Sequence, residues 1–435
     1  MTATPSSSLG AESEPVSPEA DVQPGFRNPG AGIVTAIGAA SISLMAALLS
    51  VGILTMPLKA TEIDAAGSTT IIALANLAAG VIALLLNPVM GRLSDRTLGR
   101  FGRRRPYILV GSLLIALGAF CVLQATSVAL VALGWAVMTI GQIAAQAGTF
   151  ALVPDQFAPE RRGVVSGIIG VAGSAGAIVG LFIGSLLSPN LSLMIMVPAA
   201  LAVLCNLVLA VIAKDDPIRP EDRPALRLRE AFGTFWVSPR QFPDFALAFG
   251  SRFAVFWAIA AVNAYQAVYL IMGLHIAPQD IAGKMFIANL ISGVLAIVFA
   301  TVLGKVSDKV GRRKPFVIIS AVVFAVGLAL IATAGSFEMF LVGVAIMGIG
   351  MGVYLAVDFA LITQVLPDPK NPAKDIGIMN LASSLPNIVV PAAAPLLLAI
   401  GASAASPANF GLFFGVAAVA GAIGAALIVP IRRVR

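Results

Sequence analysis

Two charged side chains stand alone inside long apolar stretches of this 435-residue chain. Arg252 lies in the run that begins near Asp244, and Asp358 lies in the run that ends near Leu366. At 1.5 Å per residue, each is about 12 Å from the nearer end of its run. Isolated charges in hydrocarbon are costly, so the two residues are predicted to form an ion pair. Such a pair could be a fixed bridge between helices, a proton- or substrate-linked switch, or a direct contact to a ligand.

Uncharged polar side chains accompany this pair. Projected at about 100° per residue, the amides of each apolar run gather on one helical face. Amides and aromatic rings suit a polyhydroxyl solute, although hydrogen bonding between helices would explain the same pattern. The candidate binding residues are Gln142, Gln146, Asn263, Gln266 and Tyr354, and the candidate coupling residues are Arg252 and Asp358.

A charged phrase occurs twice between apolar runs. Residues 91–108 read GRLSDRTLGRFGRRRPYI, and residues 304–317 read GKVSDKVGRRKPFV. A loop that only sets membrane orientation needs positive charge alone, so the repeated Gly and Asp favour a gate over a simple turn. Acidic and basic strings at 154–163 and 366–377 could join the same network or form solvated hairpins. The candidate gating residues are Gly91, Asp95, Arg96, Arg103, Gly304, Asp308 and Arg312.

The composition indicates the elements that must position these residues. The chain is 58% hydrophobic and 11% charged, with a mean hydropathy of +0.95, whereas soluble proteins carry about 25% charged residues. Runs of about 20 apolar residues can span a bilayer. We therefore predict an all-α membrane protein. Its twelve helices are expected at 33–58, 68–92, 106–126, 128–153, 164–187, 190–213, 244–272, 278–304, 315–335, 337–366, 377–400 and 407–431.

The basic residues predict the orientation. All 28 Lys and Arg except Lys59, Arg252 and Lys284 lie in the terminal tails or in alternate loops and their helix edges. The positive-inside rule places these loops and both termini in the cytoplasm. Residues 1–30 are expected to be a disordered cytoplasmic tail, and the composition favours a bacterial inner membrane. Dispersed basic residues exclude a nucleic-acid partner.

An internal repeat divides the chain. Residues 75–95 align with 288–308 at an offset of 213, with ten of 21 positions identical, and the offset falls to 209 beyond the loop. We predict six-helix halves at 31–213 and 244–435, the latter ending in a short basic tail. A cytoplasmic linker at 214–243 joins them. Parallel repeats of this kind indicate a secondary transporter with its site between the halves.

The charged phrase also carries a family resemblance. The pattern Gly-x-x-x-Asp-Arg at 91–96, followed by Gly-Arg-Arg at 102–104, resembles the loop signature of the major facilitator superfamily, and residues 304–313 are similar. The string DRTLGRFGRRRPYI resembles sucrose transporters and their glycoside–pentoside–hexuronide cation symporter relatives. The resemblance implies a twelve-helix fold whose seventh and tenth helices line the cavity and whose loops latch the cytoplasmic side.

The leading hypothesis is therefore monomeric, proton- or sodium-coupled uptake of a sugar or glycoside. The alternative is proton-driven export of a drug-like compound. Against export, the run 164–187 lacks the Pro of the drug–proton antiporter signature, and its glycines predict close helix packing. An enzyme is excluded, because the single His275 lies in a loop without metal-ligand spacing and no catalytic motif or cofactor site is recognised.

Overall fold

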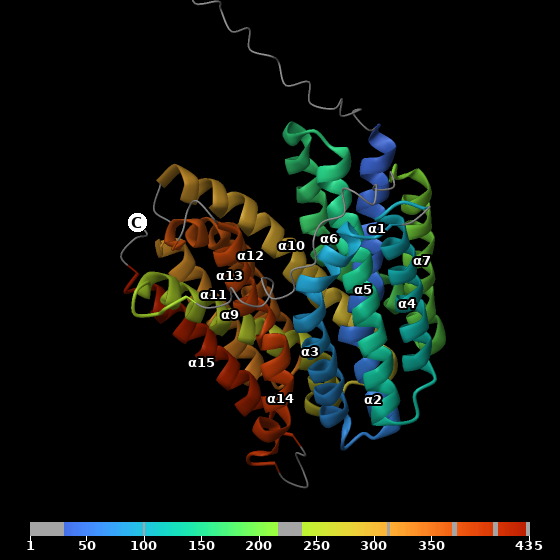
Figure 1. The fold of residues 1–435 in the computed structure, drawn as a ribbon. Helices are drawn as coiled ribbons and strands as arrows, with labels where there is room; N and C mark the ends of the chain where they lie inside the picture. Colours follow the sequence, from blue (N-terminus) through green and yellow to red (C-terminus); the bar gives the residue numbers. More distant parts are fainter. Residues whose placement is uncertain are drawn as a thin grey trace, which may run out of the picture.

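The computed structural model describes residues 30–98, 101–215, 237–310, 314–367, 372–402 and 408–431. The regular elements within these ranges are helices, which form a first group (blue to green) and a second group (yellow to red) side by side (Figure 1). The first group comprises α1 Ala31–Leu49, η1 Ser50–Thr55, α2 Met56–Ile63, α3 Ser68–Asp95, α4 Arg105–Leu123, α5 Val128–Gln156, α6 Pro159–Leu187 and α7 Leu191–Ile212. The second comprises α9 Pro243–Val268, η3 Tyr269–Gly273, α10 Pro278–Val310, α11 Lys314–Ala332, α12 Phe337–Val365, α13 Pro372–Ser384, α14 Pro386–Ala399 and α15 Phe410–Ile428.

The predicted all-α class and the twelve spans are confirmed. Within the described ranges, twelve helical stretches are long and apolar enough to cross a membrane. Some helices extend past the predicted ends: α3 reaches Asp95 and α10 reaches Val310, because a helix can continue beyond the hydrocarbon on polar residues that an apolar count omits. Two spans contain π-helical stretches, η1 and η3, and the eleventh span is broken between α13 and α14.

The two groups, here called the halves, contact each other at one end of the helices and near the middle of the spans. We call the end that carries Asp95 the charged-loop side and the other end the opposite side. Ser188 donates a hydrogen bond to the carbonyl of Gln279 at 3.0 Å, and Phe182 packs on Phe286 with ring centres 5.3 Å apart. Each of these contacts joins helix ends on the opposite side.

The apolar cores also differ between the two ends of the helices. One large core on the opposite side contains side chains of both halves, such as Leu54 and Phe414. On the charged-loop side the cores are separate: Phe157 belongs to a cluster of the first half, and Phe245 and Ile428 belong to a cluster of the second. Among the described residues, the halves therefore share a buried apolar core only toward the opposite side, where burial favours their contact.

Two contacts between the halves, near the middle of the spans, involve equivalent positions of the sequence repeat. Gly80 of α3 and Gly293 of α10 occupy matching positions of the repeat, 213 residues apart. Each faces an isoleucine of the other half: a Cβ at Gly80 would clash with Ile388 of α14, and one at Gly293 would lie 3.1 Å from Ile178 of α6. The repeated glycines thus form two matching sockets between the halves.

The glycine stripe of α6 packs closely along half of its length. A Cβ at Gly176 would lie 2.9 Å from the backbone nitrogen of Ala46 in α1, and one at Gly180 would clash with the Ala46 carbonyl. Gly167, Gly170 and Gly173 have no atom within 4 Å of such a Cβ. The predicted close approach is therefore confirmed toward the opposite side but is wrong for the charged-loop side of α6 in this conformation.

We expect Gly180→Ala to destabilise the protein by about 1–3 kcal/mol, because the added methyl group overpacks the contact with α1. The matched control, Gly173→Ala, adds a methyl group in open space and should be neutral or slightly stabilising, since Ala favours helix more than Gly does. Thermal unfolding of the purified variants in detergent measures both changes. Equal melting temperatures would contradict the close packing of Gly180.

Candidate functional site

The predicted ion pair forms inside the second half. Nη1 of Arg252, on α9, donates to Oδ2 of Asp358, on α12, and the two side chains are 13% and 8% exposed. The guanidinium carbon also lies 5.2 Å from the centre of the Phe256 ring, and Nε lies 3.4 Å from Oγ of Ser383 on α13. The pairing is thus confirmed, and Arg252 joins three helices through contacts that a cation favours.

The candidate binding residues divide into two groups. Nε2 of Gln142 donates to Oε1 of Gln146 at 2.7 Å on α5, where both are half-buried, while Asn263 on α9 is exposed. Tyr354 and Gln266 are each 2% exposed, and Nε2 of Gln266 has no hydrogen-bond partner among the described residues. Gln142, Gln146 and Asn263 therefore keep exposed surface, whereas Tyr354 and Gln266 are buried in helix packing.

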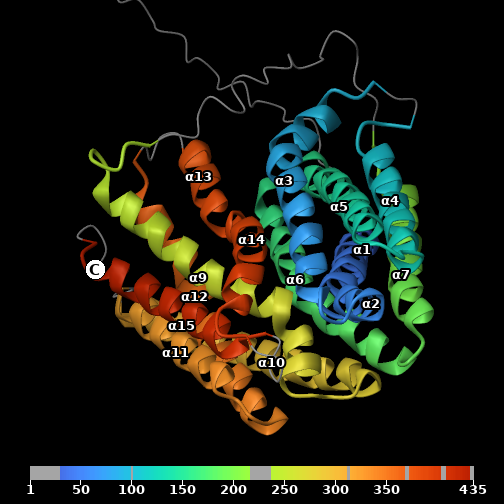
Figure 2. The same cartoon turned by 90° about the horizontal axis from the view of Figure 1, so that it is seen from below.

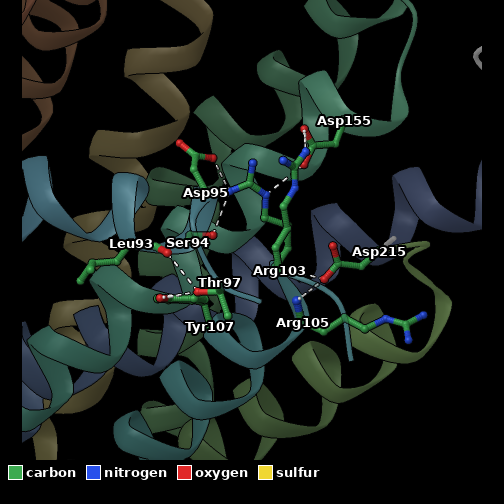
Figure 3. Close-up of polar contacts among 10 residues, drawn as sticks. Leu93, Ser94, Asp95, Thr97, Arg103, Arg105, Tyr107, Asp155 and Asp215 are labelled. Carbon is green, nitrogen blue, oxygen red and sulfur yellow. Dashed lines mark hydrogen bonds and ion pairs between the residues drawn. The ribbon is translucent and has the colours of Figure 1, made fainter. Parts of the chain in front are cut away.

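The first charged phrase forms an ion-pair network (Figure 3). Nη1 of Arg104 lies 2.6 Å from Oδ1 of Asp95, and its Nε lies 2.9 Å from Oδ2 of Asp155 on α5. Nη2 of Arg103 lies 2.8 Å from the other Asp155 oxygen, and Nη1 of Arg104 donates to Oγ of Ser94 at 2.9 Å. This network ties α3 to α5 within one half.

Arg104, which the gating prediction omitted, is the centre of the network. Its side chain is only 4% exposed. Burial lowers the pKa of Arg104, but the hydrogen bonds and charges of Asp155 and Asp95 outweigh that effect and hold it above its ordinary value. The guanidinium therefore stays charged between two carboxylates. Asp155 belongs to the string 154–163, so the prediction that this string could join the network is confirmed.

The same phrase also holds the chain that leaves α7. Oδ2 of Asp215 accepts hydrogen bonds from the backbone nitrogens of Arg104 at 2.6 Å and Arg105 at 2.8 Å, at the start of α4 (Figure 3). A carboxylate there satisfies free N–H groups and complements the helix dipole. The turn passes through Gly102 at φ +87°, where a Cβ would strike Asp215, so glycine is required.

A matching contact occurs in the second half. The Arg105 guanidinium donates to the carbonyl of Ala213 just past α7, with Nη2 at 2.5 Å. Lys314, which stands 209 residues later, donates from Nζ to the carbonyl of Ile431 just past α15, at 2.9 Å. In each half, therefore, a basic residue at the start of the third span caps the end of the sixth.

The remaining gating residues make fewer described contacts. Arg96 follows α3, and its buried Nε has no hydrogen-bond partner among the described residues. Gly91 has no atom within 4 Å of a built Cβ, and Gly304 has only Ala356 at 3.5 Å, so packing requires neither glycine in this conformation. The side chain of Asp308 and the whole of Arg312 lie outside the described residues.

The sequence prediction missed a polar set on the eleventh span. Asn380, Ser384 and Asn387 are exposed although they lie within a membrane-crossing stretch, and Ser383 beside them contacts Arg252. Their spacing of four and three residues was a readable signal, because it places them on one helical face. These side chains are uncharged, and the sequence prediction gave more weight to the spans that carry Arg252 and Asp358.

Twelve spans in two six-helix halves form a membrane transporter fold, and comparison with known proteins identifies the family. The model of the Major Facilitator Superfamily matches residues 35–300 and 281–435. The chain belongs to this superfamily. It is a multi-pass secondary transporter rather than an enzyme, and transporters of this family bind small-molecule substrates, often with proton coupling.

Individual relatives match less of the chain. The multidrug resistance protein MdtL of Klebsiella pneumoniae strain 342 is 35% identical over 126 residues, and that of Citrobacter koseri is 35% identical over 121 residues. These matches cover 29% and 28% of both proteins. They do not support the expected likeness to sucrose symporters.

Solved structures match the whole fold. The nucleoside transporter NupG superposes with a TM-score of 0.72 at 12% identity, over 92% of this chain and 98% of that one. An inward-facing bacterial homologue of the lysosomal transporter Spinster gives 0.63 at 14% identity, over 91% and 94% of the two chains. At this identity the likeness concerns the fold alone.

Proposed function

We propose that this protein is a proton-coupled transporter that exports small amphipathic organic compounds by alternating access. The observation that carries the proposal is the buried Arg252–Asp358 pair, a protonatable carboxylate that joins α12 to α9 within a two-half transporter fold. Separating a buried carboxylate from its cation favours the protonated acid, so rearrangement of the helices would bind or release a proton. Export, rather than uptake, is supported by the partial relatives named as multidrug resistance proteins.

We further propose that the charged-loop side faces the cytoplasm. The excess of Lys and Arg in the loops on that side supports this orientation. The structure would then represent an inward-facing state, since the halves share a core only on the opposite side. In a variant without native cysteines, Lys214→Cys should react only with reagents supplied from the cytoplasm, and Thr126→Cys only from outside. The reverse pattern would refute the orientation.

A second candidate is cation-coupled uptake of a sugar or glycoside. It is favoured by the amides that remain accessible inside the spans, namely Gln142, Gln146 and Asn263. Amide groups can donate and accept hydrogen bonds with several hydroxyls at once. The two candidates therefore differ in the chemistry of the compound carried and in the direction of its movement, which makes them separable by one transport experiment.

The deciding experiment uses proteoliposomes with an imposed proton or sodium gradient and three probes. We expect rhodamine 123 and tetraphenylphosphonium to move in exchange for protons, with no response to sodium. Accumulation of sucrose along an inward proton or sodium gradient would instead establish the second candidate. Asp358→Asn liposomes are the control for coupling, and failure of all three probes to move would reject the proposed function.

A further inference from the structure

The eleventh span carries a polar strip that the interactions described above leave unexplained. Asn380 and Ser384 on α13 and Asn387 on α14 are exposed in the first half of a membrane-crossing stretch, Gly377–Ala399. We propose that this strip, Asn380–Ser384–Asn387, is a hydrogen-bonding subsite for uncharged polar groups of the transported molecule, such as amines, carbonyls and hydroxyls. The proposal rests on the proposed transport function and identifies which part of a substrate this span would recognise.

The neighbours of the strip define the direction in which it points. Ser383 faces α9, because it contacts Arg252, and Ile388 faces α3 of the other half, because it fills the socket at Gly80. Leu396 is 73% exposed, as expected for an apolar side chain that faces lipid. At about 100° per residue, the strip falls between the first two directions and opposite the third. It therefore points into the space between the halves.

The arrangement of the helices agrees with this direction. Figure 2 shows α13 and α14 between α9 and α3, where the two halves face each other. α14 packs on both α3 and α9, whereas α13 packs on α9 and α14. The part of the strip on α13 thus lies on the charged-loop side of the packing between α14 and α3. Polar side chains in a span normally face such interior spaces, because lipid cannot hydrogen-bond to them.

Side chains of the strip make hydrogen bonds to backbone carbonyls near the break between α13 and α14. The hydroxyls of Ser383 and Ser384 both donate to the carbonyl of Asn380 at 3.0 Å, and the amide nitrogen of Asn387 donates to the carbonyl of Ser383 at 3.2 Å. These bonds satisfy backbone carbonyls next to the interruption. They also orient the hydroxyl of Ser384, whose oxygen keeps acceptor capacity for an incoming donor.

The strip is continuous with the ion pair. Ser383 lies next to Ser384 and contacts Arg252, so a molecule held on the strip would border the Arg252–Asp358 pair. Asn263 is exposed on α9, eleven residues after Arg252 and therefore on nearly the same helical face. A substrate bound here would lie beside Arg252, the ion-pair partner of the group proposed to carry the proton. Recognition and coupling would then occur at one place.

Accessibility tests the placement without any substrate. In a variant lacking Cys121 and Cys205, single cysteines at Asn380, Ser384 and Asn387 should react with a water-soluble maleimide supplied from the charged-loop side. Leu396→Cys is the matched control from the same span, and it should react at least about tenfold more slowly, since thiol reactivity requires access to water. If the strip reacts no faster than Leu396→Cys, the inference is overturned.

Transport tests the recognition. Rhodamine 123 carries amino and carbonyl groups, whereas tetraphenylphosphonium has the same charge and no hydrogen-bonding group. For the variant N380A/S384A/N387A we expect the KM for rhodamine 123 to rise about tenfold, because one or two hydrogen bonds are lost. The KM for tetraphenylphosphonium should not change. Equal effects on both probes, no effect on either, or a wild-type protein that transports tetraphenylphosphonium but not rhodamine 123 would overturn the subsite.

The two proposals fail in different ways. Labelling of the strip without transport of either probe by the wild-type protein would reject the proposed function but keep the strip in a water-filled space. Transport of both probes with an unchanged KM in the triple variant would reject the subsite but keep the function.

Discussion

Asp358→Asn is expected to abolish proton-driven transport while exchange of substrate down its own gradient continues. The substitution keeps the size of the side chain and its ability to accept a hydrogen bond from Arg252, but it removes the group that can take up a proton. Proteoliposomes loaded with rhodamine 123 measure both activities in the same preparation. Wild-type accumulation by the Asp358→Asn protein would show that coupling occurs elsewhere and that the pair is structural.

Substitution of the partner residue, Arg252, is expected to lower stability, whereas Asp358→Asn is expected to remove coupling. Arg252→Ala should destabilise the protein by about 3–5 kcal/mol, because Asp358 is then left charged and unpaired in a buried position. The double variant R252A/D358N removes both charges and should recover most of the stability without recovering coupled transport. Thermal unfolding of the single and double variants separates these effects. A double variant as unstable as Arg252→Ala would mean that the loss arises from packing around Phe256 rather than from the stranded charge.

Arg104→Leu is expected to remove most transport and to lower stability by about 2 kcal/mol. Its buried guanidinium holds Asp155 and Ser94 as well as Asp95, and hydrogen bonds to charged groups contribute more than neutral ones. The partial exposure of Asp155 limits the loss, since water can replace the missing partner. Arg103→Leu is the matched control: that side chain is more exposed and contacts Asp155 alone among the described residues, so its effect should be much smaller.

Substitution of Asp95, the exposed partner of Arg104, distinguishes a gating role from a folding role. Asp95 is 47% exposed, so Asp95→Asn should change stability by less than about 1 kcal/mol. We nevertheless expect Asp95→Asn, and Asp308→Asn in the second copy of the phrase, to slow transport while probe binding stays intact. Asp95 ends α3 and Asp308 lies in the last turn of α10, both on the charged-loop side, where the proposed cycle requires the halves to close. Wild-type transport rates in both variants would leave the gate without support.

The spans and the buried ion pair could be predicted because each depends on a strong one-dimensional signal. The length of an apolar run sets the length of a span, and an isolated charge in hydrocarbon requires a partner. Only two charged residues, Arg252 and Asp358, lay deep in such runs at the same depth, and the family resemblance, which implies that the seventh and tenth helices are neighbours, supported their pairing. The closely packed glycines of α6 were predicted for the same kind of reason, although only those facing α1 make the contact in this conformation.

The contacts around the charged phrase depend on tertiary structure that the sequence pattern did not reveal. Arg104 was one of three consecutive arginines, and nothing in that run distinguished the buried one from its neighbours. Asp215 stands 110 residues after Arg105, and only the packing of α7 against α4 brings its carboxylate to the start of α4. The strip on the eleventh span was missed for a different reason, since its neutral side chains were given less weight than charges.

The two glycine sockets have a geometric consequence for movement of the halves. Gly80 with Ile388 and Gly293 with Ile178 are two points of contact, and two points define a line through the interface. A rigid rotation of one half about that line keeps both isoleucines seated while the ends of the helices swing in opposite directions. Because the two glycines stand at matching positions of the repeated sequence, the repeat itself supplies the two contacts that define one rotation axis for the halves.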